Sequence, residues 1–250
     1  MAPNAHIADL NFEALPPRVP EATRVYAIGD IHGRADLLHA MQAMILADSV
    51  GGPRRQVVVY LGDYIDRGQD SFGVIDTLVN APLPGFESVH LRGNHEDFLL
   101  SFVETGEQGE NWFFNGGITT MKSYGVTAKG AAGRNTAILR ENLIDAMPVT
   151  HLYFFKGLTL SHTEGDYLFV HAGIRPGVPL SHQKPEDLMW IRTPFLHAEG
   201  GFGHVVVHGH TPDFEPVVRE NRIGVDTLAY RSGCLTCLVL EGEHRRFLQT

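Results

Sequence analysis

The chain has 250 residues, 43% of them hydrophobic, and a formal net charge of −9 at pH 7. This length fits one large domain or two small ones with a substantial core, and the acidic balance argues against a general nucleic-acid-binding surface. The two cysteines, Cys234 and Cys237, are too few for a disulfide scaffold and favour a reducing compartment. No apolar run approaches the roughly 20 residues that span a bilayer, and the N-terminus lacks the features of a signal peptide. We therefore expect a cytoplasmic protein without a membrane anchor.

The first half of the chain alternates short apolar strands with helices. Residues 1–23 carry four prolines and no clear period, which predicts an irregular leader packed on the body at Phe12 and Leu15. Strands are expected over residues 24–28, 57–61 and 88–91, and helices over 36–45, with Asp36 as N-cap, 71–80 and 98–103. This β-α-β-α-β-α order predicts an α/β fold with a largely parallel sheet.

The second half is organised differently. Residues from about 105 to 160 are rich in aromatics and glycines and are predicted to form a helical insertion, with a helix over 136–147, that covers or flanks the site. Short strands are expected over 152–155, 158–162, 167–170, 205–207, 216–219, 222–225, 234–241 and 245–248. Hairpins and a second sheet packed on the first follow from this pattern, within one domain over 24–250.

Potential metal ligands follow five of the apolar strands. The most concentrated turn is Gly62–Gly68, where a strand delivers two carboxylates and a guanidinium, and clustered carboxylates repel unless a cation lies between them. The five turns carry Asp30 and His32; Asp63, Asp66 and Arg67; Asn94 and His95; His171; and His208 and His210. Functional groups gather at the carboxyl ends of α/β strands, so these turns meet if the strands share a sheet. The set of six, Asp30, His32, Asp63, Asn94, His171 and His210, suits two ions that share one bridging carboxylate.

Each of these turns has an ordinary explanation when it is taken alone. Most of the fourteen histidines are expected to be structural or exposed. A Gly-Asp turn such as that of Asp30 is common, and Asn94 is also a good helix cap. The metal-site hypothesis depends instead on repetition, because five such turns each follow an apolar strand.

Three motifs together resemble the signature of a known family. Gly29–Gly33, Gly62–Gly68 and Gly93–Glu96, in this order and spacing, are similar to the phosphoprotein phosphatase family of calcineurin-like metallophosphoesterases. His171-Ala172-Gly173 and Gly209-His210 fit the same family. The compact chain and Trp190-Ile191-Arg192 make it most similar to the bacterial and phage serine/threonine phosphatases of that family. The resemblance implies a two-sheet β-sandwich flanked by helices with two metals at one edge. One metal would take Asp30, His32 and Asp63, and the other Asp63, Asn94, His171 and His210. Manganese is the expected metal, with iron and zinc as alternatives.

The implied chemistry is in-line attack of a metal-bridging hydroxide on phosphorus. Arg67 is the expected phosphate clamp, because guanidinium pairs with phosphate oxygens in bidentate fashion. Arg192 is a second clamp by analogy, and Arg175 is its competitor. Asn94 and His95 complete the expected phosphate contacts.

The leaving alkoxide needs a proton, and His95 is the expected donor. Asp66 would hold His95 protonated and oriented, although Asp66 also fits a turn-stabilising role. Glu96 is interpreted as a first-turn carboxylate that stabilises a helix dipole. His208 is interpreted as structural.

Two further features are expected to matter little for the chemistry. Asp226 precedes Thr227 and Leu228, where bacterial relatives often have Asp-Thr-Gly, which puts the local backbone in doubt but removes no ligand. Cys234 and Cys237 are expected as buried thiols rather than a metal pair, since residues three apart on a strand point to opposite faces.

Two functions remain open on these residues. The first is a serine/threonine protein phosphatase, and the second is a hydrolase of small nucleotides such as symmetrical diadenosine tetraphosphate hydrolase. A binding module without catalysis is disfavoured because no expected ligand is missing. The expected partners are a phosphorylated protein or a small phosphoester, with no nucleic acid and no membrane.

Overall fold

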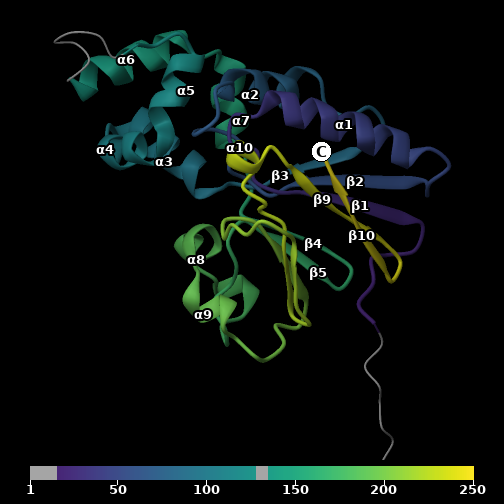
Figure 1. Ribbon diagram of the computed structural model, residues 1–250. Coiled ribbons are helices and arrows are strands. Elements are labelled where there is room, and N and C mark those ends of the chain that lie inside the picture. Colours follow the sequence, from purple (N-terminus) through teal and green to yellow (C-terminus); the bar gives the residue numbers. More distant parts are fainter. Residues whose placement is uncertain (1–15, 128–134) are drawn as a thin grey trace, which may run out of the picture.

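The computed structural model describes residues 16–127 and 135–250. Two five-stranded sheets pack against each other, with helices on their outer faces (Figure 1). The strand orders are β10-β9-β1-β2-β3 and β4-β5-β6-β8-β7. The predicted α/β fold, with two sheets flanked by helices, is therefore confirmed. Among the described residues, no helix has the length and apolarity needed to cross a membrane.

The first sheet is built from the first three strands and the last two strands in chain order. Its strands are β1 (Thr23–Ile28), β2 (Arg55–Tyr60), β3 (Glu87–His90), β9 (Thr236–Glu241) and β10 (His244–Gln249). Strands β1, β2 and β3 are parallel, and β9 is antiparallel to both β1 and β10. The parallel part is the half that was expected from the alternating strands and helices.

The second sheet is built from the β-rich half. Its strands are β4 (Ser161–Glu164), β5 (Tyr167–Val170), β6 (Val205–His208), β7 (Val217–Val218) and β8 (Arg222–Gly224). Strands β5, β6 and β8 are parallel, and β4 and β7 add antiparallel hairpins at the two edges. Both sheets therefore have a parallel centre.

Helices fall into three groups in Figure 1. Helices α1 (Ala35–Ser49) and α2 (Ser71–Asn80) lie along the first sheet, and α8 (Pro185–Trp190) and α9 (Thr193–Leu196) flank the second. The third group lies at one end of the first sheet: α3 (Asn94–Thr105), α4 (Gly109–Trp112), the π-helical turn η1 (Phe113–Gly117), α5 (Ile118–Ser123), α6 (Thr136–Ala146) and α7 (Val149–Lys156). A 3₁₀ turn, η3 (Leu180–His182), precedes α8, and α10 (Ala229–Ser232) lies between β8 and β9.

The central strands are buried on both faces, which explains their nearly continuous apolar sequences. On β1, Tyr26 and Ile28 pack against the helices, whereas Val25 and Ala27 face the second sheet. Phe169 and similar residues of the second sheet complete the inner core. A smaller cluster packs the outer face of the second sheet against α8 and α9. This double burial holds the central strands between the helices and the second sheet.

Three local expectations need correction or lie outside the description. Residues 152–155 are helical, within α7, and not a strand. Arg34, not Asp36, is the N-cap of α1, and Asp36 lies in its first turn. The predicted contacts of Phe12 and Leu15 lie outside the described residues. Within the described part of the leader, Val19 is buried and its N–H donates to the carbonyl oxygen of Gly242.

Candidate metal centre and acid–base pair

The five predicted turns meet at one edge of the sandwich, although their strands do not share a sheet. Strands β1, β2 and β3 belong to the first sheet, and β5 and β6 belong to the second. The His171 ring, after β5, has its Nε2 atom 3.4 Å from Oδ1 of Asp63, after β2. The condition of one shared sheet is therefore not met, yet the turns still meet because the parallel strands of both sheets end at the same edge.

The turns are strained and closely packed. Eight non-glycine residues in the described chain have positive φ, and five of them are predicted site residues: His32, Asp63, Asp66, Arg67 and His210. Such backbone persists only where surrounding structure enforces it. Gly93 and Gly209 show how tight the packing is, since a Cβ atom at either would collide with Asp63 Oδ1 or Asp30 Oδ1. The glycines let the turns approach each other closely.

Asp63 is the centre of the cluster. Its Oδ2 atom is 3.5 Å from Nε2 of His32, and its Oδ1 atom is 3.4 Å from Nε2 of His171. Burial alone would raise the pKa of Asp63, but His171, His95 and other histidines around it hold the pKa well below its ordinary value. Asp63 is thus an ionised carboxylate shared by residues of both sheets.

Backbone carbonyls fix the ring orientation of two predicted ligands. His32 Nδ1 lies 2.8 Å from the Ile65 carbonyl oxygen, and His171 Nδ1 lies 2.9 Å from that of Leu61. Each Nδ1–H therefore donates to its carbonyl, which leaves an unprotonated Nε2 facing the oxygens of Asp63. Burial lowers the pKa of both rings and favours this neutral form. The Nε2 lone pairs and the Asp63 oxygens that they face can bind a cation between them. The backbone carbonyls orient the two rings through the other ring nitrogen, as is usual for histidines that bind metals.

Asn94 and His210 extend this arrangement. Asn94 Oδ1 lies 3.0 Å from His171 Nε2 and 2.9 Å from His210 Nδ1. Burial and the neighbouring His171 lower the pKa of His210 to about 2. Asp63, His171 and His210 form one group whose ligand atoms lie within 4.8 Å of one another. The donor set predicted for the second metal is therefore assembled.

The other group with this spacing is His32, Asp63 and His95. The prediction placed Asp30 here instead of His95. Asp30 is buried beside the cluster, and its carboxylate accepts a hydrogen bond from the backbone N–H of His210 at 3.2 Å. Burial, Asp226 and Asp63 raise the pKa of Asp30 well above its ordinary value. A cation beside Asp30 would oppose this rise in its pKa. The role of Asp30 as a metal ligand stays a prediction.

His95 and Asp66 form a buried pair. His95 Nδ1 lies 2.6 Å from Asp66 Oδ2, and both side chains are almost fully buried. Burial alone would lower the pKa of His95, but Asp63 and the bond to Asp66 raise the pKa above its ordinary value. Burial raises the pKa of Asp66, and its bonds to His95 and other donors oppose that rise. The Nδ1–H of His95 donates to Asp66, and the raised pKa of His95 favours a second proton on Nε2, which is the proton that the predicted general acid would donate.

Glu96 does more than the predicted helix-dipole interaction. It lies in the first turn of α3, as expected, but it is fully buried. Its carboxylate accepts backbone hydrogen bonds from Asp63 at 2.8 Å, Tyr64 at 2.8 Å and Gly93 at 2.9 Å. Burial and Asp63 act to raise the pKa of Glu96, but the backbone donors oppose that rise and leave no acceptor for a carboxyl proton, so Glu96 is ionised. Glu96 therefore joins the turns after β2 and β3.

The arginines separate clearly. Arg67 donates to His32 Nε2 at 2.8 Å, and its other terminal nitrogen lies 3.1 Å from His95 Nε2, which can accept from it only while His95 is neutral. Its guanidinium lies 5.1 Å from the ring centre of Tyr230. Arg192 is exposed and donates to the His210 carbonyl oxygen at 3.1 Å.

Arg175, the competitor for the second clamp, is held elsewhere. It makes two hydrogen bonds to Asp187, at 2.8 and 2.5 Å. A guanidinium paired in bidentate fashion with a carboxylate has little left to offer a phosphate. Of the two alternatives, the geometry favours Arg192.

The remaining predicted residues lie beside the site. His208 is buried, donates to the Gly209 carbonyl oxygen at 2.9 Å and packs edge-on against Phe195, as a structural histidine would. Burial lowers the pKa of His208 to about 4. Asp226 is also buried, and burial raises its pKa to about 6. Cys237 is a buried thiol in β9, as expected, but the expectation was wrong for Cys234, which is partly exposed and precedes that strand.

Two site residues were missed from the sequence. Trp112 donates its indole N–H to Asp66 Oδ2 at 2.9 Å, and the Thr120 hydroxyl donates to Asp66 Oδ1 at 2.5 Å. Both are fully buried and come from the predicted insertion. A buried tryptophan needs a partner for its N–H, but the sequence does not indicate which residue supplies it.

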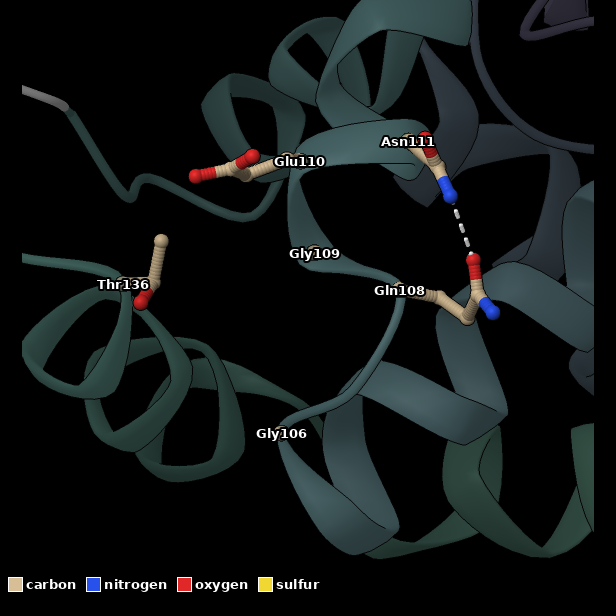
Figure 2. Close-up of a pocket in the computed structure, with 6 residues that line it drawn as sticks. All are labelled: Gly106, Gln108, Gly109, Glu110, Asn111 and Thr136. Carbon is tan, nitrogen blue, oxygen red and sulfur yellow. Dashed lines mark hydrogen bonds between the residues drawn. The ribbon is translucent and has the colours of Figure 1, made fainter.

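A separate surface pocket of about 400 Å³ lies in the insertion, away from these residues (Figure 2). It is lined by Gly106, Gln108, Gly109, Glu110, Asn111 and Thr136. In it, the Asn111 amide donates to Gln108 Oε1 at 2.7 Å. Two of the six lining residues are glycines without side chains, and none belongs to the cluster described above.

Comparisons with known proteins agree with this geometry. A family model described as calcineurin-like phosphoesterase matches residues 23–233. The chain is 28% identical over 217 residues to serine/threonine-protein phosphatase 1 of Salmonella typhimurium, covering 85% of this chain and 89% of that protein. It is 27% identical over 231 residues to the asymmetrical bis(5'-nucleosyl)-tetraphosphatase PrpE of Anoxybacillus flavithermus, covering 84% and 88%. A solved structure of a cold-active protein tyrosine phosphatase superposes with a TM-score of 0.54 at 18% identity, covering 92% of this chain and 81% of that chain.

Proposed function

This chain belongs to the calcineurin-like phosphoesterase family, whose members are metal-dependent hydrolases, and we propose that it acts on phosphoserine and phosphothreonine in proteins. The similarity to a bacterial serine/threonine phosphatase over most of both chains supports this substrate class. The observation that carries the proposal is the buried His95–Asp66 pair, with 2.6 Å between Nδ1 and Oδ2.

The pair matters because of the leaving group. Serine and threonine leave as alkoxides, which are strong bases and need a proton in the transition state. A phosphate or nucleotide leaving group is already a weak base and departs with little help. A histidine whose pKa is raised, and which a buried carboxylate holds, therefore accelerates the cleavage of an alkyl phosphoester more than the cleavage of a nucleotide substrate.

The remaining residues hold the substrate and the metals. Asp30, His32 and Asp63 would hold one ion, and Asp63, Asn94, His171 and His210 the other, with manganese as the proposed metal. When bound, such ions activate water as a nucleophile and neutralise charge on the phosphoryl group. Asp63, between rings from both sheets, is the proposed shared ligand.

We assign phosphate binding to Arg67 and Arg192. Arg67 contacts Nε2 of both His32 and His95 in this structure. A metal ion on His32 Nε2, or a proton on His95 Nε2, would replace one of those bonds and release a donor for a phosphoryl oxygen. Arg192 lies at the exposed side of His210 and would meet the same phosphoryl group from the solvent side. Asn94 and His95 complete the proposed contacts.

A small-nucleotide hydrolase is the second candidate, because two observations favour it. The chain resembles a bis(5'-nucleosyl)-tetraphosphatase over 84% of its length. Trp190 is 39% exposed, packs edge-on against Phe98, and has its ring centre 6.1 Å from that of His210. An exposed indole next to the site offers a stacking surface for a nucleobase.

One assay distinguishes the two candidates. The manganese-loaded protein is given a phosphoserine peptide and diadenosine tetraphosphate side by side, with and without a chelator. We expect chelator-sensitive release of phosphate from the peptide at a higher kcat/KM. Preference for the dinucleotide would replace the first candidate by the second, and activity that survives the chelator would count against both.

Two broader assignments complete the proposal. The catalytic domain is proposed to run over residues 24–250 as one unit. A cytoplasmic location is proposed because both cysteines are free thiols, which a reducing compartment preserves.

A further inference from the structure

The carboxylate of Asp66 is held by more than its histidine. Its Oδ1 atom accepts the Thr120 hydroxyl, and its Oδ2 atom accepts His95 Nδ1. The Trp112 indole N–H lies 3.1 Å from Oδ1 and 2.9 Å from Oδ2. Both of these additional donors come from the insertion, far away along the sequence. Three donors on one buried carboxylate leave it no freedom to rotate.

Thr120 fixes the backbone of Asp66 as well as its side chain. The Asp66 N–H donates to Thr120 Oγ1 at 2.9 Å and to Ser71 Oγ at 3.0 Å. The two hydroxyls are themselves 2.9 Å apart, so Ser71 donates to Thr120 while Thr120 donates to the carboxylate. Asp66 has a φ of 72°, a conformation that depends on outside support. The hydroxyl pair supplies that support.

The stretch of chain between Trp112 and Thr120 also contacts Arg67. A Cβ atom added to Gly116 would lie 2.9 Å from Arg67 N, and a Cβ atom added to Gly117 would lie 2.5 Å from the Trp112 ring. The backbone of η1 therefore packs directly on Arg67 and under the indole. Helices α4 and α5 lie together in the helical group at the end of the first sheet (Figure 1). We call residues 112–120 the acid-support segment.

We propose that the acid-support segment positions the general acid, with Trp112 and Thr120 as positioning residues that act on His95 through Asp66. This inference rests on the proposed phosphoesterase function. The segment keeps Oδ1 bound so that Oδ2 points at His95 Nδ1, and this aims the opposite ring nitrogen at the leaving oxygen. The insertion is thereby part of the catalytic machinery rather than a cover over it.

The test compares leaving groups in variants with matched shapes. Thr120→Val removes the hydroxyl, Thr120→Ser restores it, and Trp112→Phe removes the indole N–H. The manganese-loaded proteins are assayed on a phosphoserine peptide and on p-nitrophenyl phosphate, whose leaving group needs no proton. We expect Thr120→Val and Trp112→Phe to lower kcat/KM on the peptide about tenfold or more, and to lower it less than about threefold on p-nitrophenyl phosphate. Thr120→Ser should recover most of the loss.

Thr77→Val is the control for losing a buried threonine hydroxyl, because among the residues that the structure describes the Thr77 hydroxyl bonds only to the Gly73 carbonyl oxygen, within α2, and to His39. It should leave both rates within about twofold of wild type. Thermal unfolding checks each variant, and Trp112→Phe decides the matter if Thr120→Val does not fold. Equal losses on the two substrates in a folded variant, or no recovery in Thr120→Ser, would overturn the inference. Failure of the wild-type protein to hydrolyse either substrate would instead overturn the proposed function.

Discussion

Replacing Glu96 by glutamine tests whether this carboxylate fastens two site turns together. Its Oε2 atom accepts the N–H groups of Asp63 and Gly93, and its Oε1 atom accepts those of Tyr64 and, at 3.4 Å, Ile65. Glutamine has nearly the same shape but carries an NH₂ group in place of one oxygen. Either orientation of the amide turns a donor toward buried backbone donors and leaves them unpaired.

The magnitude follows from the number of bonds. A hydrogen bond to a charged group contributes about 1.5–3 kcal/mol, and a stranded buried donor costs a similar amount. With two such donors affected, Glu96→Gln should lower the free energy of unfolding by about 3–5 kcal/mol. An interaction with the helix dipole alone would predict a loss of only about 0.3–1 kcal/mol.

Asp97 provides the matched control, because it lies in the same first turn of α3 but is partly exposed. Asp97→Asn should cost about 0.3–1 kcal/mol. Urea unfolding at pH 7, followed by circular dichroism with a chelator present, measures both variants without a contribution from metal. Equal losses of less than about 1 kcal/mol in the two variants would refute the fastening role of Glu96.

Three further perturbations address the metals, the acid stability and the clamp. Asp63→Asn should abolish phosphatase activity and lower the content of both metals after dialysis; near-normal turnover would remove Asp63 as the shared ligand. Burial lowers the pKa of His90, which stacks on Tyr60, to about 4, so native His90 stays neutral while the unfolded chain binds a proton below about pH 6.5. The contribution of neutral His90 to stability is complete above that pH and is lost as the pH falls toward 4. His90→Phe should therefore reduce the acid-induced loss in unfolding free energy by up to about 3 kcal/mol. Parallel curves of unfolding free energy against pH for the variant and the wild type would contradict this. Arg192→Ala should lower kcat/KM about tenfold or more through KM, whereas Arg175→Ala should change it less than about twofold, and the reverse order would exchange their roles.

The sequence predicts the central cluster well because its residues are adjacent to strand ends. Asp63 and Asn94 each follow a β-strand within a few residues, and apolar strands are the easiest elements to recognise. Parallel strands then bring the turns together by geometry alone. The turns did not need to share one sheet, because His171 reaches the same edge from the second sheet.

The acid-support segment was harder to predict for a physical reason. Trp112 and Thr120 lie 46 and 54 positions from Asp66 along the chain. They belong to a region without strands, so no strand-end rule applies to them. The role of Glu96 was predicted incompletely, because its position in the first turn of a helix already offered a local explanation. Its burial depends on a tertiary contact with the turn that contains Asp63.

The aromatic run at 152–155 shows how composition can mislead. Tyrosine and phenylalanine favour strands, but the run forms α7 after Pro148. His151 and Phe155 are buried four residues apart, whereas Tyr153 is exposed. That is a helical period, and packing of this face against the first core overrides the local preference.

The distribution of the site between two sheets connects ion binding to the assembly of the molecule. Asp63 and Asn94 come from the first sheet, and His171 and His210 come from the second. An ion held by all four residues would cross-link the two sheets at this edge of the sandwich. Its binding free energy would add to the cohesion of the inner core, because a ligand that binds only the native state stabilises that state. The metal concentration in the protein's surroundings would then set how firmly the two halves hold together as well as how fast the enzyme turns over.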